Sequence, residues 1–427
     1  MNYDELVQLL KSEVRPAMGC TEPAAIAFTV ASAREMLKGT VLKVKVYLSS
    51  NVFKNAMAVN IPSIGEAGPV IAAAIGAVKG ESKDQLKIFS NLNEKDIEQV
   101  HKMVASGQVD VNSAEKSGLY IEAEVTDESE TAIVTVNGGH TEITKKVLNG
   151  TLVYEKALSD ENMFEKVDLK KYRISDLVEA ISKISLSKIS FLEQGIEMNM
   201  SIAEQGLKIG PGLGVGAGLN SILKNGVFQN DLVCKVRMAV AAACDARMSG
   251  LELPVMSTMG SGNQGIVASI PVVVVGREAN VGREKVLRAL ALSHLVTAYV
   301  KQHVGKLSPM CGCAIAAGAG ATAAITWLLG GDSTKVCGSV QNIIGDLSGM
   351  ICDGAKGGCA LKLSTSGAEA VIMAQLALNN VVIKSSDGII SFSVEETVQN
   401  LAKLGISGMS KTDNVILDIM MSKEQIA

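Results

Sequence analysis

The sequence predicts an α+β fold in which a large, mostly helical domain carries a smaller inserted α+β domain. Segments of alternating apolar and polar residues gather between residues 38 and 160, whereas the apolar period is helical almost throughout after Ser175. The 427 residues are 47% hydrophobic and 20% charged, which is enough for two or three domains with large cores. We therefore expect residues 1–37 and 165–427 to form the helical domain and residues 38–164 to form the insertion.

The elements follow from the local period of the apolar residues. A helical period predicts helices over residues 4–14 and 22–37, the second with Pro23 near its start. Strict alternation predicts half-buried strands at residues 41–48, 120–125, 131–136 and 141–147. An Asn-Gly-Gly-His turn at residues 137–140 separates the last two strands. Helices are expected between the strands at residues 67–79 and 94–106.

Composition and charge exclude several classes of protein. Aromatic residues make up 3% of the chain and the formal net charge is −4, with scattered lysines, so a nucleic-acid surface is not expected. The first twenty residues are amphipathic and acidic, and we predict no signal peptide. Eight cysteines in so long a chain fit a reducing cytoplasm better than a disulfide framework. The apolar run from residue 311 to residue 330 is long enough to cross a bilayer, but it is rich in glycine and alanine and lacks flanking basic clusters, so we expect a buried helix and no membrane insertion.

Cysteines beside glycine or proline are the most informative local feature. They occur in Met-Gly-Cys-Thr-Glu-Pro at residues 18–23, Pro-Met-Cys-Gly-Cys at 309–313, Met-Ile-Cys-Asp-Gly at 350–354 and Gly-Gly-Cys at 357–359. The spacing of Cys311, Cys352 and Cys359 matches neither a ferredoxin run nor a structural zinc site. Widely separated single ligands would instead hold an iron–sulfur cluster assembled by the tertiary fold, and three ligands to four irons would leave one iron open. A catalytic thiol and plain buried cysteines remain the alternatives.

Several segments together resemble the L-cysteine desulfidase family, which is related to the α-chain of iron–sulfur L-serine dehydratases. The resemblance covers essentially the whole chain. It is carried by Gly-Cys-Thr-Glu-Pro at residues 19–23, Ser-Ser-Asn at 49–51 with Lys-Asn at 54–55, Cys-Asp-Ala-Arg-Met at 244–248, Gly-Ser-Gly-Asn-Gln-Gly at 260–265 and Ser-Gly-Met-Ile-Cys-Asp-Gly at 348–354.

The resemblance implies a [4Fe–4S] enzyme that eliminates sulfide from L-cysteine to give pyruvate, ammonia and hydrogen sulfide. The motif match makes Cys20, Cys311 and Cys352 the cluster ligands. The dehydratase relatives place their third ligand further along the chain, which brings in Cys359, although it follows Cys352 more closely than their pattern expects. We prefer Cys20, because its segment is a desulfidase feature.

Elimination also needs a base for the α-proton and donors for the substrate carboxylate. Glu22 is the first candidate base, with His140 as a rival and Lys54 as a further catalytic candidate; His294 is expected to be a buried core histidine. The glycine loop at residues 260–265 offers backbone N–H groups as a carboxylate cradle. The substrate-binding residues that we predict are Ser49, Asn51, Asn55, Ser261, Gly262, Asn263 and Gln264.

Other readings remain open at this point. L-Serine is the substrate in the dehydratase branch of the same family. A non-catalytic cluster or thiol sensor, or a small-molecule-binding protein, would need no turnover. Asp245 and Arg247 could form an ion pair or orient the substrate. The glycine-rich run at residues 210–218 lacks the βαβ context of a dinucleotide site. Glycine-rich helix surfaces favour self-association, most simply as a two-fold homodimer.

Overall fold

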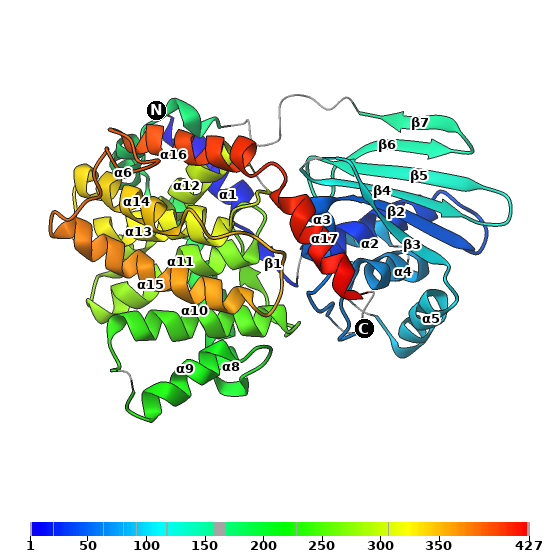
Figure 1. Cartoon of the computed structure of the whole chain (residues 1–427), viewed down its shortest axis with the longest axis horizontal. Helices are drawn as coiled ribbons and strands as arrows, with labels where there is room; N and C mark the ends of the chain where they lie inside the picture. Colours follow the sequence, from blue (N-terminus) through cyan, green and yellow to red (C-terminus); the bar gives the residue numbers. More distant parts are fainter. Residues whose placement is uncertain are drawn as a thin grey trace.

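The computed structural model describes residues 2–19, 21–62, 64–79, 81–90, 92–116, 118–156, 167–227, 229–305 and 307–424. These residues form an α+β fold, as predicted, with a helical body on one side and a layer of sheet and helices on the other (Figure 1). Each side has its own hydrophobic core.

One large sheet, six-stranded in the described residues, forms the outer layer of the smaller body (Figure 1). β2 and β3 are parallel, and every other neighbouring pair is antiparallel. The predicted alternation is confirmed in β4, whose residues are alternately buried and half-buried. The strands, in sheet order, are β3 (Val109–Ala114), β2 (Lys43–Ser49), β4 (Tyr120–Thr126), β5 (Thr131–Asn137), β6 (Ile143–Leu148) and β7 (Thr151–Glu155).

Helices pack on one face of this sheet and make the second core. α2 is buried along almost its whole length and lies against α4, and an Asn93–Asp96 capping box starts α5. This arrangement explains the alternation in the strands, because only one face of the sheet faces the core. The helices are α2 (Thr21–Arg34), α3 (Ser50–Ala56), α4 (Pro69–Lys79), α5 (Glu94–Ala105) and the 3₁₀-helix η1 (Ser82–Lys87).

The helical body contains the first and larger core. Its elements begin with α1 (Tyr3–Glu13), β1 (Pro16–Ala17), η2 (Leu169–Lys171), α6 (Ile174–Lys183), α7 (Leu186–Ile189), α8 (Leu192–Ile209), α9 (Val215–Lys224) and α10 (Leu232–Met248). They continue with β8 (Val255–Met256), α11 (Gly262–Glu278), α12 (Arg283–Val304), η3 (Cys313–Ala317), α13 (Gly318–Leu328), α14 (Ser333–Leu347), α15 (Cys359–Leu378), α16 (Val394–Lys403) and η4 (Leu404–Gly408). α17 (Thr412–Glu424) follows at the junction of the two bodies (Figure 1).

Glycine and alanine let these helices approach each other closely. A Cβ atom on Gly206 of α8 would collide with the backbone carbonyl of Ala242 in α10, and one on Gly320 of α13 would collide with Ser293 and Thr297 of α12. A chain with few aromatic side chains therefore fills its interior by bringing backbones together.

The two cores divide the chain differently from the predicted domains at two places. α2 lies in residues 1–37, which we assigned to the helical domain, yet its side chains pack in the second core. Leu417 of α17 also joins the second core. Both helices carry apolar side chains that complete the covering layer of the sheet. The division at residues 38 and 164 itself stays a prediction, since residues 157–166 lie outside the described part of the chain.

The apolar run from residue 311 to residue 330 lies inside the helical body. It forms η3 and α13, which pack against α11, α12, α14 and α15. In the part of the chain that the structure describes, no helix has both the length and the apolar character needed to cross a membrane.

Candidate functional site

Two cysteine segments are tied together by backbone hydrogen bonds. The amide of Cys311 donates to the Met350 carbonyl at 2.8 Å, and the amide of Cys352 donates to the Pro309 carbonyl at 2.7 Å. Met310 and Ile351 form an isolated antiparallel bridge between them. This pairing places two cysteines that are 41 positions apart in sequence side by side.

The thiols of Cys311, Cys352 and Cys359 lie close enough to influence one another electrostatically. Burial raises the pKa of Cys352, and it raises the pKa of Cys359 to about 11. The pKa of Cys311 is lowered to about 6, first by a hydrogen bond from the Cys313 thiol and then by nearby backbone amides and Lys362. Cys244 of α10 is fully buried and lies within electrostatic reach of Cys311 and Cys359. The structure therefore places Cys244 and Cys313, which were not predicted as site residues, beside the predicted ligands.

Two lysines donate hydrogen bonds to the Cys352 segment. Lys54 of α3, which is only 1% exposed, donates to the Cys352 carbonyl at 2.8 Å. Lys362 of α15 donates to the Ile351 carbonyl at 2.9 Å and forms an ion pair with Asp353. Both ammonium groups counteract the effect of burial on the pKa of Cys352, so they favour its thiolate.

Glu22 lies at the start of α2 and is buried. Its carboxylate accepts hydrogen bonds from the Thr21 hydroxyl at 3.0 Å and from the Asn55 amide at 3.1 Å. Nε2 of His140, which is buried and makes no hydrogen bond within the described chain, lies 3.9 Å from the same carboxylate. The two predicted candidates for the base are therefore neighbours, and Asn55 fixes the orientation of Glu22.

The glycine loop of the helical body lies beside His140. The position of a Cβ atom on Gly260 would be 3.7 Å from Cε1 of His140. Gly262 to Gln264 are the first turn of α11 and not a loop as expected, so their N–H groups point from a helix N-terminus. The Gln264 side chain lies over Gly312, 3.0 Å from where a Cβ would be, and its buried Oε1 has no hydrogen-bond partner in the described residues.

These contacts close a ring at the junction of the two bodies. Lys54 donates to the Cys352 carbonyl, and its neighbour Asn55 donates to Glu22, which lies near His140. His140 lies near Gly260 of the glycine loop. Gln264, from the same loop, contacts Gly312, which follows Cys311. The buried polar atoms Nε2 of His140 and Oε1 of Gln264 have no partner in the described residues and could bind a ligand, because buried polar groups normally have hydrogen-bond partners.

Other predicted substrate-binding residues are already engaged with protein groups. The Ser49 hydroxyl donates to the Gly118 carbonyl at 2.7 Å, and Ser261 caps α11 by accepting from the Gln264 amide at 3.3 Å. Oδ1 of Asn263 accepts from Arg247 at 2.9 Å. Oδ1 of Asn51 is buried and has no partner in the described chain. Gln264 and Asn51 thus keep free acceptors, whereas Ser49, Ser261 and Asn263 hold the framework.

Asp245 and Arg247 do not pair with each other. Asp245 accepts from the Gly216 amide at 2.9 Å, and burial raises its pKa. Arg247 reaches Asn263 and, at 2.5 Å, the Gly19 carbonyl. The arginine therefore links the start of α11 to the turn before α2. The glycine-rich run at residues 210–218 connects the end of α8 to the first turn of α9.

The donor set fits an iron–sulfur cluster. In the described residues, no three His, Cys, Asp or Glu side chains are spaced to share one metal ion. A four-iron cluster is wider than a single ion, so its thiol ligands stand further apart, and the thiols of Cys311, Cys352 and Cys359 converge beside two ammonium groups that suit an anionic cluster. Cys20 lies outside the described residues, although its neighbours Gly19 and Thr21 border the site.

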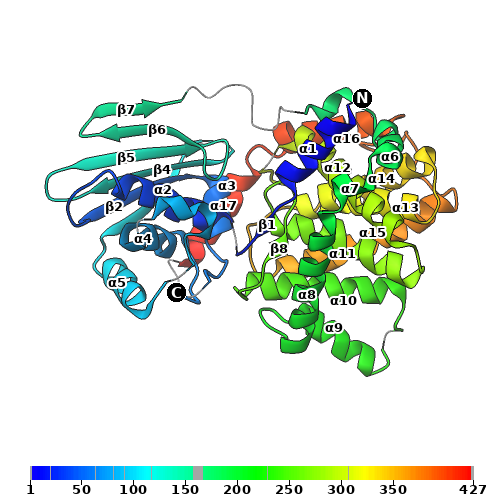
Figure 2. The ribbon, with the colours of Figure 1, turned by 180° about the vertical axis from the view of Figure 1, so that it is seen from behind.

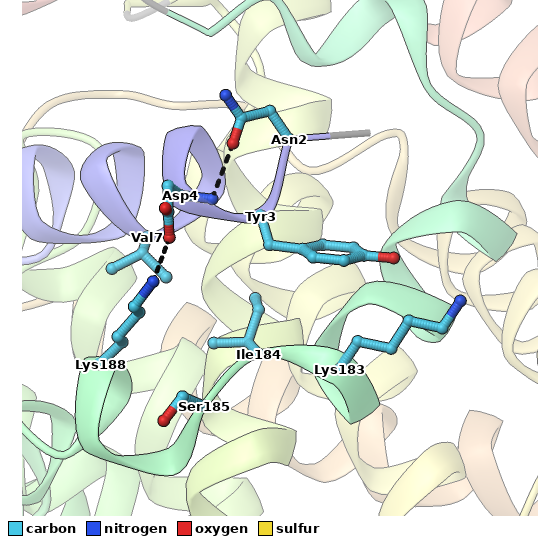
Figure 3. Close-up of a pocket in the computed structure, with 8 residues that line it drawn as sticks. All are labelled: Asn2, Tyr3, Asp4, Val7, Lys183, Ile184, Ser185 and Lys188. Carbon is cyan, nitrogen blue, oxygen red and sulfur yellow. Dashed lines mark hydrogen bonds and ion pairs between the residues drawn. The ribbon is translucent and has the colours of Figure 1, made fainter.

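A separate pocket of about 560 Å³ lies on the helical body (Figure 3). None of its lining residues was predicted as a site residue. Lys188 forms an ion pair with Asp4 and Lys183 forms one with Glu179, so each ammonium group already has a carboxylate partner. The lining residues are Asn2, Tyr3, Asp4, Val7, Lys183, Ile184, Ser185 and Lys188.

Sequence reasoning missed residues that act through the tertiary fold. Lys362 carries no local signal, since it lies within α15. Cys313 could have been found, because it stands two positions after Cys311 in the same segment.

The fold and the site define an α+β protein in which clustered thiols are linked, through contacts at the junction of two cores, to a carboxylate and an imidazole. The serine dehydratase alpha chain family model matches residues 83–418. The chain belongs to this family, and the predicted relationship to the dehydratase α-chain is confirmed.

Close relatives extend over nearly the full length. A UPF0597 protein of Clostridium botulinum (strain Okra / Type B1) is 41% identical over 97% of this chain and 96% of its own. A UPF0597 protein of Caldanaerobacter subterraneus is 41% identical, covering 98% of both chains. One from Desulfotalea psychrophila is 40% identical with the same coverage.

Proposed function

We propose that the chain is an iron–sulfur-dependent lyase that eliminates the β-substituent of a small amino acid, with L-cysteine as substrate and pyruvate, ammonia and hydrogen sulfide as products. The observation that carries the proposal is the ring of contacts that links the clustered thiols of Cys311, Cys352 and Cys359 to Glu22 and His140. Membership of the serine dehydratase alpha chain family supports the same class of reaction.

Cys311 and Cys352 would hold a [4Fe–4S] cluster together with Cys20 or Cys359. When bound, such a cluster with three protein ligands supplies a Lewis acid for the leaving sulfur or oxygen. Lys54 and Lys362 hold the carbonyls of the Cys352 segment and so fix the direction of its thiol.

The remaining roles belong to polar groups of the ring. Glu22 removes the α-proton, and Asn55 keeps its carboxylate in place. The N–H groups at the start of α11 favour the substrate carboxylate, and the unpartnered Oε1 of Gln264 accepts from the substrate ammonium. Loss of the proton and of sulfide leaves an enamine, which tautomerises to an imine, and water hydrolyses the imine to pyruvate and ammonia.

The test is anaerobic reconstitution with iron and sulfide, followed by pyruvate and sulfide assays on L-cysteine. We expect Cys352→Ser to lose both the visible absorbance of the cluster and turnover, because it removes a thiolate ligand. Cys337→Ser is the matched control: Cys337 lies in α14, and the charged groups that affect its pKa are Glu395 and Asp332, not the clustered thiols. Equal behaviour of the two variants would refute the proposal. Comparing iron content in Cys20→Ser and Cys359→Ser identifies the third ligand.

L-Serine is the second candidate substrate, because the matching family model is that of the serine dehydratase alpha chain. Turnover of L-serine without release of sulfide from L-cysteine assigns the chain to that reaction. A stable cluster with no turnover on either amino acid points to a sensor or binding protein.

A further inference from the structure

The end of the chain crosses from the helical body to the sheet body. We call residues 404–417, which comprise η4 and the start of α17, the C-terminal strap. In both views α17 lies at the junction, next to α3 (Figures 1 and 2). The strap begins beside α16 of the first core and ends with Leu417 in the second core.

The strap contacts both cysteine segments. Gly405 lies so close to Met310 that a Cβ atom on it would collide with the Met310 methyl group, one residue before Cys311. Asp413 forms an ion pair with Lys54, and the same ammonium group donates to the Cys352 carbonyl. One segment therefore touches the residue before Cys311 directly and reaches Cys352 through a single side chain.

The Lys54 contact belongs to a tightly packed part of the junction. The side chain of Lys54 is 1% exposed and that of Asp413 is 15% exposed, so water screens their pairing poorly. Gly354 packs directly against the Lys54 carbonyl and has a φ of +95°, a conformation that a residue with Cβ rarely adopts. One residue along the strap, Asn414 accepts a hydrogen bond from the Ser50 hydroxyl at 2.7 Å, and this contact does not involve the cysteine segments.

We propose that Asp413 is a positioning residue: it holds the Lys54 ammonium against the Cys352 carbonyl, so that docking of the C-terminal strap fixes the cysteine segment in its cluster-binding conformation. A buried ammonium without its carboxylate is unfavourable. Loss of the Asp413 charge should therefore release the Lys54 side chain from this position, which weakens its hydrogen bond to the Cys352 carbonyl. The consequence for catalysis rests on the proposed function, but the structural link does not.

The test compares Asp413→Asn with Asn414→Ala in protein without iron. We expect Asp413→Asn to speed amide hydrogen exchange of residues 350–358 about tenfold or more, as expected for losing a hydrogen bond to a charged group. Asn414→Ala removes the neighbouring strap contact and should leave that exchange nearly unchanged. Asp413→Glu, which keeps the charge, should restore slow exchange. After anaerobic reconstitution, Asp413→Asn should also retain less iron than Asn414→Ala.

Equal exchange rates in Asp413→Asn and Asn414→Ala would overturn the proposal. The Asp413–Lys54 ion pair would then affect the cysteine segment no more than the neighbouring Asn414–Ser50 hydrogen bond does. If Asp413→Asn does not fold, the unmodified chain carries the test. Low urea should then increase exchange of residues 350–358 and of residues 409–416 in parallel, and independent responses would contradict the link. Failure of the wild-type chain to bind iron would refute the proposed function while leaving these exchange results interpretable.

Discussion

At the residue scale, the site depends on side chains whose partners are fixed by the protein. Glu22 is oriented by Thr21 and Asn55, whereas His140 has an unpartnered Nε2 near it. A carboxylate held by donors keeps its position while the proton moves, which suits a base. The imidazole nitrogen Nε2, at 3.9 Å, can receive that proton in the tautomer in which Nε2 carries no hydrogen.

We predict that Glu22→Gln lowers kcat on the preferred substrate by about 10²–10⁴-fold and changes KM little, because the amide keeps the shape but cannot accept the α-proton. Steady-state kinetics of the reconstituted enzyme measure this, with iron content as a check that the cluster is retained. His140→Gln should have the smaller effect on kcat. A larger loss in His140→Gln would transfer the role of base to the histidine.

His294 makes stability depend on pH. It is 3% exposed in α12, and burial lowers its pKa to about 4 from an ordinary value near 6.5. Between these values the unfolded chain binds the proton more tightly than the folded chain, so stability falls as pH falls. Going from pH 7.5 to pH 5 should cost about 2 kcal/mol at this residue.

His294→Leu should remove that part of the pH dependence. Urea unfolding followed by the fluorescence of Trp327, which lies in α13 of the same core, is the measurement. His101→Leu is the control, because the His101 side chain is 47% exposed and should leave the pH dependence of this core as it is in the wild-type chain. An unchanged pH dependence in His294→Leu would show that the folded chain accommodates the charged imidazole.

At the element scale, backbone contact between helices decides where side chains fit. α9 carries two glycines that differ only in their surroundings. A Cβ atom on Gly216 would lie 2.6 Å from Cβ and 2.7 Å from Cα of Ala242 in α10, whereas one on Gly218 would meet nothing within 4 Å. Both glycines belong to the glycine-rich run at residues 210–218, and only the packing distinguishes them.

Gly216→Ala should destabilise the chain by about 1–3 kcal/mol, because α9 and α10 must move apart. Gly218→Ala should be neutral or stabilising by up to about 1 kcal/mol, because alanine loses less backbone entropy in a helix. Urea midpoints of the two variants measure the difference. Equal destabilisation would mean that α9 is held too loosely for the contact to matter.

At the scale of the whole molecule, the junction of the two cores joins what the sequence separates. Glu22 and Lys54 come from elements of the second core, whereas Cys311 and Cys352 belong to the helical body. Each core can form from its own apolar pattern, but the ring exists only when the two are docked. α17, which enters the second core through Leu417, contributes to that docking.

The periodic elements could be predicted from the sequence alone. Local alternation predicts the strands β2, β4, β5 and β6, and helical period predicts the helices α4 and α5. In each element the period also identifies the apolar face that is buried. The cysteine segments were also recognisable from their glycine and proline neighbours and from the family resemblance. Their roles as ligands stay a prediction.

The contacts between side chains that are far apart in sequence could be seen only in the tertiary structure. The assignment of α2 to the second core, the pairing of Lys54 with Asp413, and the separation of Asp245 from Arg247 depend on contacts between residues far apart in sequence. The physical reason is that local period fixes which face of an element is buried, whereas the partner of a buried charge is fixed by which other element packs against that face.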